Sequence, residues 1–400
     1  MKRLKQFFIV MFAVSAVIST TLVSCDNPND PSLDDSTSDI VWRGDSDDIY
    51  YDVISVPDGV VAVGKTASND SWSYNAVIAK YDNNGNIVWK NYAGNYREDA
   101  FISVTATSDG FVAVGHSLYG HGYDLLPGAG FAYVATIVKY DNSGNLIWAK
   151  GAECGPFSSV IAVSDGIIAV RGGWGGITKF DNNGNVIWEK PELIGYTTAI
   201  KVSDGIVALD CYDTIIKLDN NCNVVWKTHT NTLLFGDDYH LYFSITAVSD
   251  GFIAVGSYGD SFADADWRCR NGIWDAIIVK YDNNGNVIWG KNFGGSAGDA
   301  YYSATATVNG IIVIGQSNYG SFGNGDWTGV AAKSNEYSGF GNDFIIVKYD
   351  NAGNVVWKNN FDGDTNWGGS LAAVSDGIVV VGGFGLGREG PNIVKYKIPD

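Results

Sequence analysis

The stretch "YDNNGNIVW" at residues 81–89 recurs along the chain and decides its fold. Each copy places Asp, Asn and Gly between a largely apolar run ending in Lys and an apolar pair followed by Trp. Asp, Asn and Gly tolerate the backbone conformations of tight turns, so the phrase predicts a β-hairpin. Further copies stand at 140–148, 180–188, 218–226, 281–289 and 349–357.

A calcium loop is the functional alternative for this phrase, because Asp82, Asn84 and Asn86 are spaced like the first ligands of an EF-hand. That loop also needs Gly at its sixth position and a bidentate Glu at its twelfth. Here Gly85 stands at the fourth position and an apolar run follows at once. We therefore expect a capped turn and no metal site. Cys222 replaces the Gly in one copy, so that turn must tolerate a side chain or adopt another shape.

A second phrase precedes each hairpin and occurs seven times, from "SVPDGVVAVG" (55–64) to "AVSDGIVVVG" (373–382). Together the phrases predict four strands per unit: strand a ends at the Asp-Gly turn, strand b follows it, strand c ends in Lys, and strand d carries the Trp. Successive hairpin Trp residues lie between 38 and 68 residues apart. Four strands at a minimal period near 40 residues predict a β-propeller.

The number of blades follows from a missing strand. The last unit stops at "NIVKYKIPD" (392–400) without a strand d, whereas "DIVW" (39–42) stands alone near the N-terminus. We predict an all-β fold, a seven-bladed β-propeller of four-stranded blades over residues 39–400, closed by the N-terminal strand. We expect the strand-d Trp residues to pack between neighbouring blades. They are Trp42, Trp89, Trp148, Trp188, Trp226, Trp289 and Trp357.

The repeat resembles the β-propeller repeats of secreted and lipoprotein chains of bacteria. The likeness is clearest in "GGSAGDAYYSATATVNGIIVIGQS" (294–317) with "DFIIVKYDNAGNVVW" (343–357). The hairpin with its Trp is also similar, more distantly, to the tryptophan-docking motif of quinoprotein propellers. The resemblance implies the fold and leaves the function open, because such scaffolds serve many roles.

The N-terminus has the layout of an export signal, with a basic start, an apolar run from Phe7 to Ile18, and then small residues. The end of this segment, Leu22-Val23-Ser24-Cys25, resembles the lipobox of bacterial lipoproteins. The resemblance implies that residues 1–24 are removed, and that Cys25 carries diacylglycerol on its thiol and an acyl chain such as palmitate on its amine. Two or more acyl chains anchor a protein stably in a membrane.

Residues 25–38 are polar and acidic and contain Pro, which predicts a disordered tether after the lipidated Cys25. Asp26 resembles an inner-membrane retention signal of some bacteria, whereas an acidic stretch after the Cys resembles a surface-export signal of others. Both readings stay open. We expect an exported bacterial lipoprotein of the cell envelope, at the outer membrane or cell surface in preference to the inner membrane.

Charge and cysteine content narrow the function further. The net charge is −18, and it becomes −21 without Lys2, Arg3 and Lys5 of the signal segment, so binding to nucleic acid is not expected. The remaining cysteines show no metal-ligand spacing and their pairing is open. They are Cys154, Cys211, Cys222 and Cys269. We expect no cofactor, no metal and a monomer.

Candidate binding residues gather in the b–c and d–a loops, which share one end of a propeller. The length variation is concentrated there, at 65–75, 116–134, 227–242, 257–275 and 316–343. Aromatic side chains in such loops suit a recognition surface, although they can also pack their own loops. The candidates are Trp72, Tyr74, Tyr119, His121, Tyr123, Trp174, Tyr239, His240, Trp267, Trp274, Trp327 and Trp367.

Strand a predicts a polar ring around the central channel. The residue seven places before each turn Gly is polar in every unit, and the next residue is apolar. Such a ring fits a hydrated channel or a ligand site. Its members are Asp52, Ser103, Ser159, Thr198, Ser244, Ser303 and Ser370.

Three functions fit these features. The leading hypothesis is a lipid-anchored, non-enzymatic propeller that binds a protein or glycan through its long loops. A carbohydrate-active enzyme is the first alternative, because acid pairs such as Asp237/Asp238, Asp264/Asp266 and Asp47/Asp48 stand in loops, but the chain shows no nucleophile motif and no assembled acid–base set. The second alternative is an envelope-assembly scaffold, similar to lipoprotein propellers of outer-membrane assembly.

Overall fold

The computed structural model divides into Met1–Ser38 and Asp39–Asp400, and only the second unit contains residues that it describes. The structure describes residues 39–44, 48–67, 74–94, 98–118, 133–152, 155–173, 175–193, 195–210, 214–229, 239–259, 274–333, 342–362, 369–382 and 392–399.

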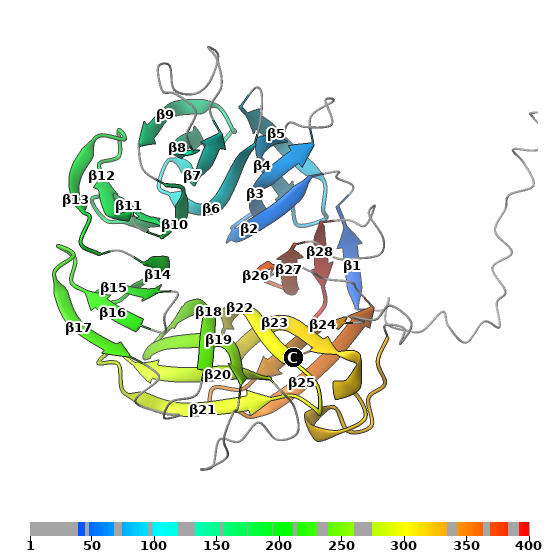
Figure 1. Cartoon of the computed structure of the whole chain (residues 1–400). Coiled ribbons are helices and arrows are strands. Elements are labelled where there is room, and N and C mark those ends of the chain that lie inside the picture. Colours follow the sequence, from blue (N-terminus) through cyan, green and yellow to red (C-terminus); the bar gives the residue numbers. More distant parts are fainter. Residues whose placement is uncertain are drawn as a thin grey trace, which may run out of the picture. The chain divides into compact units, whose positions relative to one another are not determined.

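Seven four-stranded antiparallel sheets form a ring, and each sheet is one blade (Figure 1). The predicted seven-bladed propeller is therefore confirmed. The first three blades consist of β2 (Ile49–Val56), β3 (Gly59–Ala67), β4 (Tyr74–Asp82) and β5 (Ile87–Ala93); β6 (Asp99–Thr107), β7 (Gly110–Leu118), β8 (Tyr133–Asp141) and β9 (Leu146–Ala152); and β10 (Phe157–Val163), β11 (Gly166–Arg171), β12 (Gly176–Phe180) and β13 (Val186–Lys190).

The next three blades follow the same order from the centre outward. They consist of β14 (Tyr196–Val202), β15 (Gly205–Asp210), β16 (Thr214–Leu218) and β17 (Val224–His229); β18 (Tyr239–Val248), β19 (Gly251–Gly259), β20 (Asp275–Asp282) and β21 (Val287–Phe293); and β22 (Asp299–Thr307), β23 (Gly310–Asn318), β24 (Asn342–Tyr349) and β25 (Val355–Asp362).

The last blade combines the two ends of the chain, as the missing strand predicts. Its sheet runs β26 (Ser370–Val374), β27 (Gly377–Val381), β28 (Ile393–Tyr396) and β1 (Ile40–Arg43) from the centre outward. β1 pairs antiparallel with β28, with Ile40 opposite Tyr396 and Trp42 opposite Lys395. Closing the ring in this way pairs an edge that the last blade would otherwise leave open.

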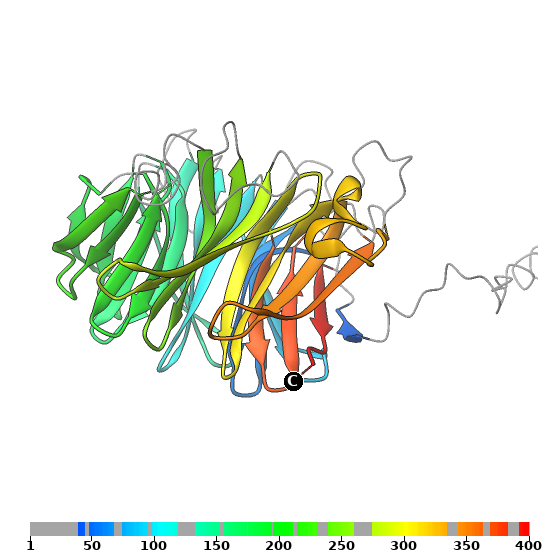
Figure 2. The same ribbon diagram turned by 90° about the horizontal axis from the view of Figure 1, so that it is seen from below.

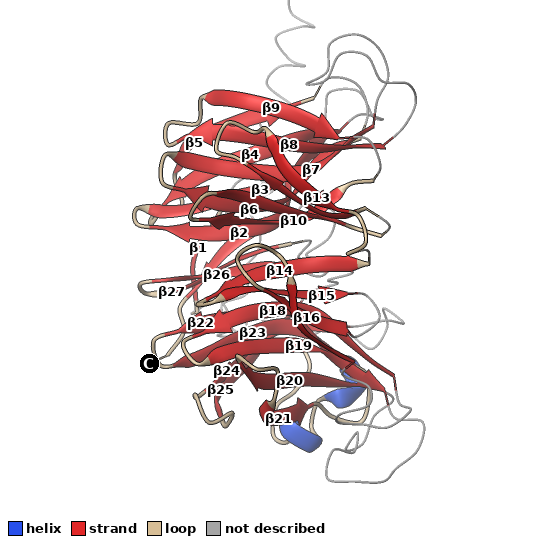
Figure 3. Ribbon diagram, turned by 90° about the vertical axis from the view of Figure 1, so that its left-hand side faces the viewer, coloured by secondary structure: helices blue, strands red, loops and turns tan. Residues whose placement is uncertain are grey.

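Alternation of strand direction puts the a–b and c–d turns at one end of the ring, called the turn end here (Figures 2 and 3). The b–c and d–a connections share the opposite end, called the loop end. In every blade two residues separate strand a from strand b, whereas the connection between β23 and β24 spans residues 319–341. This connection lies at the loop end and contains two short 3₁₀ helices, η2 (Tyr319–Ser321) and η3 (Gly325–Trp327).

The recurring phrase is a c–d hairpin closed by its own Asp, which confirms the expected capped turn. In the first copy the Asp82 carboxylate accepts hydrogen bonds from the backbone N–H groups of Asn84 (2.9 Å) and Asn86 (2.8 Å) and from the Asn86 side-chain amide (2.9 Å). These bonds lower the pKa of Asp82. Gly85 has φ +84°, which a residue without Cβ adopts without strain. Cys222 takes the same place with φ 55° and keeps the turn hydrogen bond to Asp219.

Five blade Trp residues donate a hydrogen bond to the turn of the next blade. The Trp89 indole N–H donates to the backbone carbonyl of Asn142 (3.2 Å), and Trp148 donates to Asn182 (3.1 Å). A Cβ built on Gly144 would lie 2.7 Å from the Trp89 ring, so the turn Gly also makes room for the indole. The expected packing between blades is thus confirmed. Equivalent bonds join Trp42 to Asn83, Trp226 to Asn283 and Trp289 to Asn351.

A Lys at the end of strand c joins the a–b turn of its own blade to the c–d turn of the next blade, as in the second, fourth and last blades. Lys139 is buried, and its ammonium contacts the Asp109 carboxylate at 2.8 Å and the Asn182 carbonyl of the next blade at 3.4 Å. The pair with Lys139 lowers the pKa of Asp109. The sixth blade carries Asn309 in place of the Asp, and there Lys348 donates to the Pro399 carbonyl near the C-terminus.

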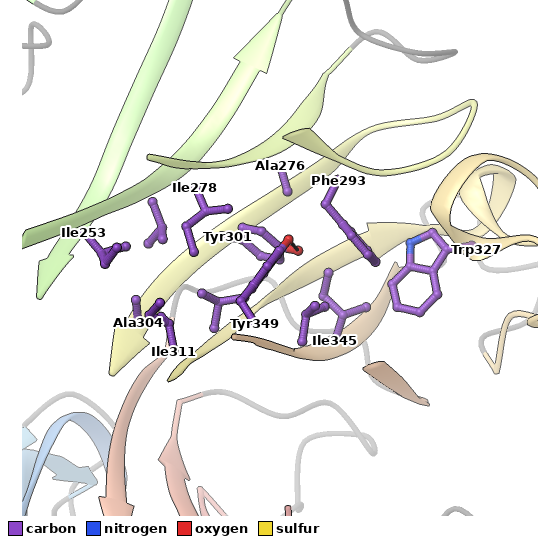
Figure 4. Packing of buried hydrophobic residues seen from close by; sticks show 13 residues of the cluster. Ile253, Ala276, Ile278, Phe293, Tyr301, Ala304, Ile311, Trp327, Ile345 and Tyr349 are labelled. Carbon is purple, nitrogen blue, oxygen red and sulfur yellow. Dashed lines mark hydrogen bonds between the residues drawn. The ribbon is translucent and has the colours of Figure 1, made fainter. Parts of the chain in front are cut away.

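Apolar side chains fill the space between neighbouring blades. The cluster between the fifth and sixth blades includes Ile278, Phe293, Tyr301, Ile345 and Tyr349 (Figure 4). The Tyr301 and Tyr349 hydroxyls lie 2.8 Å apart within it, so both polar atoms are paired. Strands b and c supply most of this core because both of their faces are covered, and their sequences are correspondingly continuous apolar runs.

Candidate functional site

The seven polar residues predicted to ring the channel do line a central cavity of about 460 Å³. Each comes from strand a of a different blade, and the prediction is therefore confirmed. The ring lies within strand a, seven residues before the Gly of each a–b turn, as Asp52 precedes Gly59. Its members are Asp52, Ser103, Ser159, Thr198, Ser244, Ser303 and Ser370.

A second layer of side chains lines the same cavity, and the sequence analysis missed it. In six blades a β-bulge interrupts the pairing of strands a and b at this point, for example between Tyr50 and Asp52. A bulge turns two successive side chains to the same side of a strand, so the residue before each ring member also faces the channel. This layer contains Tyr51, Ile102, Ser158, Thr197, Phe243, Tyr302 and Gly369.

The polar ring has a structural role, because strand a is the inner edge of every blade. The Val104 N–H donates to the Asp52 carboxylate of the preceding blade at 2.9 Å. In the same way the Val160 N–H donates to the Ser103 hydroxyl at 3.3 Å, and the Ala199 N–H donates to Ser159 at 3.2 Å. These side chains satisfy backbone groups that no strand pairs. Each serine that accepts such a bond keeps its own hydroxyl proton as a donor.

Asp52 is the one carboxylate among the described residues that line the cavity. One oxygen accepts from the Val53 N–H and the Ser370 hydroxyl, each at 2.9 Å, and the other accepts from Val104. Burial within the ring raises the pKa of Asp52, and these hydrogen bonds offset only part of the effect. The carboxylate thus joins the first, second and last blades and is already occupied by donors of the protein.

Aromatic rings add an apolar surface to the hydroxyl-lined cavity. The rings of Phe243 and Tyr302, from the fifth and sixth blades, lie 5.7 Å apart. Phe243 is 43% exposed, although it belongs to an inner strand. Burial raises the pKa of Tyr302 to about 12, so its phenol stays neutral and can donate a hydrogen bond. Apolar ring faces beside hydroxyls and one carboxylate match the chemistry of a small neutral polyhydroxylated molecule.

A buried carboxylate organises the loop end of the sixth blade. Asp299 is 1% exposed and accepts hydrogen bonds from the Gly295 N–H (3.0 Å) and the Ser321 hydroxyl (2.8 Å), and also from the Ser317 hydroxyl. Burial is the main cause that raises the pKa of Asp299 to about 7, and the nearby Asp275 adds to it. The role of Asp299 is not visible in the sequence, because one Asp at a strand start does not reveal its partners.

Trp327 was expected as a recognition residue, and the structure corrects this interpretation. Its side chain is fully buried in the cluster between the fifth and sixth blades (Figure 4). The ring centroid lies 5.1 Å from that of Phe293 and 4.9 Å from that of Phe322, and the Lys358 ammonium lies 5.6 Å from it. At this position the alternative reading holds, because the aromatic side chain packs the base of its own loop.

Two other candidates have described side chains at the loop end. Trp274 is 39% exposed, and the Lys65 ammonium lies 4.2 Å from the ring centre of Tyr74. Tyr239 and His240 belong to β18, but their side chains are outside the described set. The other candidates also lie outside the described residues, together with Cys25, Cys154, Cys211 and Cys269. They are Trp72, Tyr119, His121, Tyr123, Trp174, Trp267 and Trp367.

The acid pairs suggested for catalysis can be followed only in part. Asp48 is buried and forms an ion pair with Lys90 at 2.6 Å, whereas Asp47, Asp237, Asp238, Asp264 and Asp266 lie outside the described residues. Within the described part of the chain no group of three His, Cys, Asp or Glu residues is arranged to hold a metal ion. Cys222 is buried there and has no disulfide partner, and burial raises the pKa of its thiol to about 11.

Comparisons with known proteins support the fold alone. No protein-family model matches the chain, and none of the curated proteins matches it. Its structure is similar to Raptor from Chaetomium thermophilum (TM-score 0.57, 10% identity, 90% of this chain and 29% of that one) and to the WD40 β-propeller domain of Doa1 (0.55, 12%, 90% and 97%). BamB from Moraxella catarrhalis has a TM-score of 0.49 at 13% identity, covering 89% of this chain and 96% of that one.

Fold and cavity together define the class of this protein as a seven-bladed β-propeller with a polar central cavity. The loop end differs from blade to blade, whereas the turn end repeats the same kinds of contact. No helix in the described residues combines the length and apolar character that crossing a bilayer requires.

Proposed function

We propose that this protein is a lipid-anchored binding propeller without catalytic activity, which recognises a glycan or a glycan-bearing protein in its central cavity. The observation that carries the proposal is the cavity in which Ser and Thr hydroxyls from six of the seven blades lie beside the Phe243–Tyr302 pair. The lipobox-like Leu22–Cys25 segment supports the lipid anchor. Tethering a binding module to an envelope concentrates it where extracellular glycans arrive.

The physical argument for a glycan rests on two complementary surfaces. Sugar rings have an apolar face that packs on aromatic side chains, and their hydroxyls both donate and accept hydrogen bonds. Phe243 offers the aromatic surface at 43% exposure, while Ser159 and its neighbours offer hydroxyls. A cavity of about 460 Å³ is within the usual size of a small-molecule site, so it suits one or two sugar units.

A glycosidase needs two carboxyl groups on either side of the bond that it cleaves. Among the described residues lining the cavity, Asp52 supplies one, and three protein donors already bind it. The observation therefore favours binding over hydrolysis. An envelope-assembly role predicts a different outcome, in which the protein co-purifies with membrane-protein machinery independently of glycans.

A glycan array and a pull-down from envelope extract test the proposal, using the mature chain with Cys25→Ser so that it stays in solution. We expect a glycan ligand whose binding falls at least tenfold in Phe243→Ala and in Tyr302→Ala. Tyr92→Ala is the matched control, because Tyr92 is an exposed aromatic residue on outer strand β5, away from the cavity. Trp267→Ala tests whether the long b–c loop of the fifth blade, at residues 257–275, contributes to binding.

Two outcomes contradict the proposal. Binding that survives both cavity substitutions but is lost in Trp267→Ala would move the site to the loops. Release of reducing sugar from a bound oligosaccharide would favour the enzyme. Circular dichroism melts of all variants separate loss of binding from loss of folding.

A further inference from the structure

The outer strand of every blade exposes a β-branched apolar residue directly before the blade Trp. These residues are between 49% and 57% exposed. In each blade a β-bulge falls at this residue, for example where Tyr81 pairs with Ile87 and Lys80 pairs with Trp89. Outer strands of soluble proteins usually carry charge at such exposed places. The seven residues are Val41, Val88, Ile147, Ile187, Val225, Ile288 and Val356.

The contacts between blades connect these residues into one surface, which we call the apolar rim. In β9, for example, Leu146 precedes Ile147 and is 55% exposed. That strand leaves the turn on which Trp89 of the previous blade docks. Wherever a blade Trp bonds to the turn of the next blade, the apolar residues of the two blades are neighbours in the same way. The apolar residues, the Trp rings and the c–d turns therefore follow one another around the turn end. Val308, in an a–b turn at this end, is 96% exposed.

Charge at the turn end is nearly balanced, although the chain as a whole has a net charge of −18. The hairpin turns contribute twelve Asp residues, and each strand c supplies one buried Lys beside them. Every strand d adds a Lys or Arg within two residues of its Trp, as Arg43 follows Trp42 and Lys150 follows Trp148 by two. Two of these, Lys90 and Lys358, bind protein groups away from the turns. The excess of negative charge therefore lies elsewhere in the chain, so an anionic surface repels the turn end less than the other segments.

The segment that precedes the propeller joins it at this rim. β1 begins at Ile40 and runs away from the turn end, so Asp39 lies where the apolar rim passes through the last blade. The Asp39 carbonyl is fixed there by the Lys397 N–H at 2.7 Å. Fourteen residues from Cys25 to Ser38 span at most about 50 Å when fully extended.

We propose that the apolar rim rests on the lipid surface in which Cys25 is anchored, so that the loop end points away from the membrane. This inference relies on the lipid anchor proposed above. Val and Ile side chains enter the acyl boundary, half-buried Trp residues lie at the interface, and exposed strand-d cations such as Arg43 and Lys150 contact anionic headgroups. The anchor holds the propeller near the bilayer, so each apolar pair needs to contribute only weakly.

Two labelled variants test this orientation in the lipidated chain, reconstituted in vesicles of phosphatidylethanolamine and phosphatidylglycerol. Val88→Cys and Tyr92→Cys each receive an environment-sensitive fluorophore, in a background where the other free cysteines are Ala. Both residues are 54% exposed on β5, but Val88 lies at the turn end and Tyr92 toward the loop end. They are therefore a matched pair.

We expect a blue shift and at least twofold quenching by spin-labelled lipids for the probe at Val88, and neither change at Tyr92. Replacing Val41 and Ile147 by Ser should reduce the quenching at Val88 by about half, because these residues flank it on the rim, in the last and second blades. Equal signals at both probes overturn the proposal. A signal at Val88 that grows with protein density at fixed lipid, and not with lipid, also overturns it, because it indicates a second copy as the occupant.

The lipid anchor and the docking of the rim on the membrane are tested by separate measurements, so one can be disproved without the other. Mass spectrometry of the mature chain and its flotation with vesicles show whether Cys25 is acylated. If it is not, the same pair of probes is measured after Cys25 is coupled to a maleimide lipid. A rim signal then supports the docking surface even though the natural anchor is absent.

Discussion

The two ends of the propeller are built by opposite rules. At the turn end the same three contacts recur: an Asp that caps its hairpin, a Trp that docks on the next blade, and a buried Lys that joins two turns. At the loop end each blade is different, and order depends on single clusters such as that around Asp299. Repetition thus marks the scaffold, and its failure marks the region where binding can diversify.

The largest effect is expected from a Trp at the variable end. Trp327→Ala should lower the free energy of unfolding by about 3–5 kcal/mol, because it empties a fully buried site beside Phe293. Trp274→Ala, a substitution of an exposed Trp at the same end, should cost under about 1 kcal/mol. Urea unfolding of both variants measures this difference. Equal losses of unfolding free energy in the two variants would contradict the expectation that burial of the Trp determines the loss.

A blade Trp should be worth less than Trp327, although the repeat uses it seven times. Trp148→Ala removes a half-buried ring and its hydrogen bond to Asn182, so we expect a loss of about 2–3 kcal/mol. Trp148→Phe keeps most of the packing and should lose about 1 kcal/mol, the value of the bond. Denaturant midpoints give both numbers. A loss in Trp148→Ala as large as that in Trp327→Ala would remove the distinction between the ends.

The ends should also respond to pH in opposite directions. The pKa of Asp299 rises from 3.8 to about 7, so the folded state binds its proton more tightly than the unfolded state. The stability that this group contributes is therefore complete below about pH 4 and is lost as pH rises to about 7. Asp109 and its counterparts have lowered pKa values, so their contribution is present above the unfolded pKa and is lost as pH falls.

Unfolding curves of wild type and Asp299→Asn between pH 4 and pH 8 test this contrast. The stability of wild type relative to the variant should fall across that range by on the order of 2–4 kcal/mol. The same comparison with Asp109→Asn should be nearly flat across this range, and wild type should lose stability relative to that variant only as pH falls below about 4. A flat difference for Asp299→Asn would show that its carboxyl is ionised throughout.

The smallest effect should come from the turn ion pairs. Asp109→Asn at pH 7 should cost about 0.5 kcal/mol, because the Asp109 side chain is 60% exposed and solvent screens its pair with Lys139. The sixth blade already carries Asn309 in this position and still forms its sheet. Thermal melts of Asp109→Asn, with Asn309→Asp as the reverse substitution, measure the value. A loss above about 2 kcal/mol would make the pair as important as the Trp contact.

The sequence predicts the scaffold well because every scaffold contact repeats. Seven copies of one phrase and six of the other require a shared last blade, and β1 pairs with β28 as expected. The polar ring is likewise visible, because a fixed distance from a turn Gly places a residue at one depth in the channel. Position in the sequence determines position in space wherever the repeat is regular.

Features that depend on unrepeated geometry escape this reasoning. The β-bulge beside Asp52 shifts the register by one residue, and only the backbone pairing reveals that Tyr51 also faces the channel. Trp327 and Trp274 look alike as loop aromatics in the sequence, yet one is buried and the other is 39% exposed. Their difference arises from contacts with Phe293 and Phe322, which no spacing rule specifies.

The pairing of β1 with β28 also fixes the order of events during synthesis. The residues that complete the last blade leave the ribosome first, and their partner leaves it more than 340 residues later. Blades can form one by one, but the ring stays open until the final strand has appeared. If the chain is exported through a membrane, the part that has already crossed has no partner for β1. That part therefore exposes an unpaired strand until β28 has also crossed.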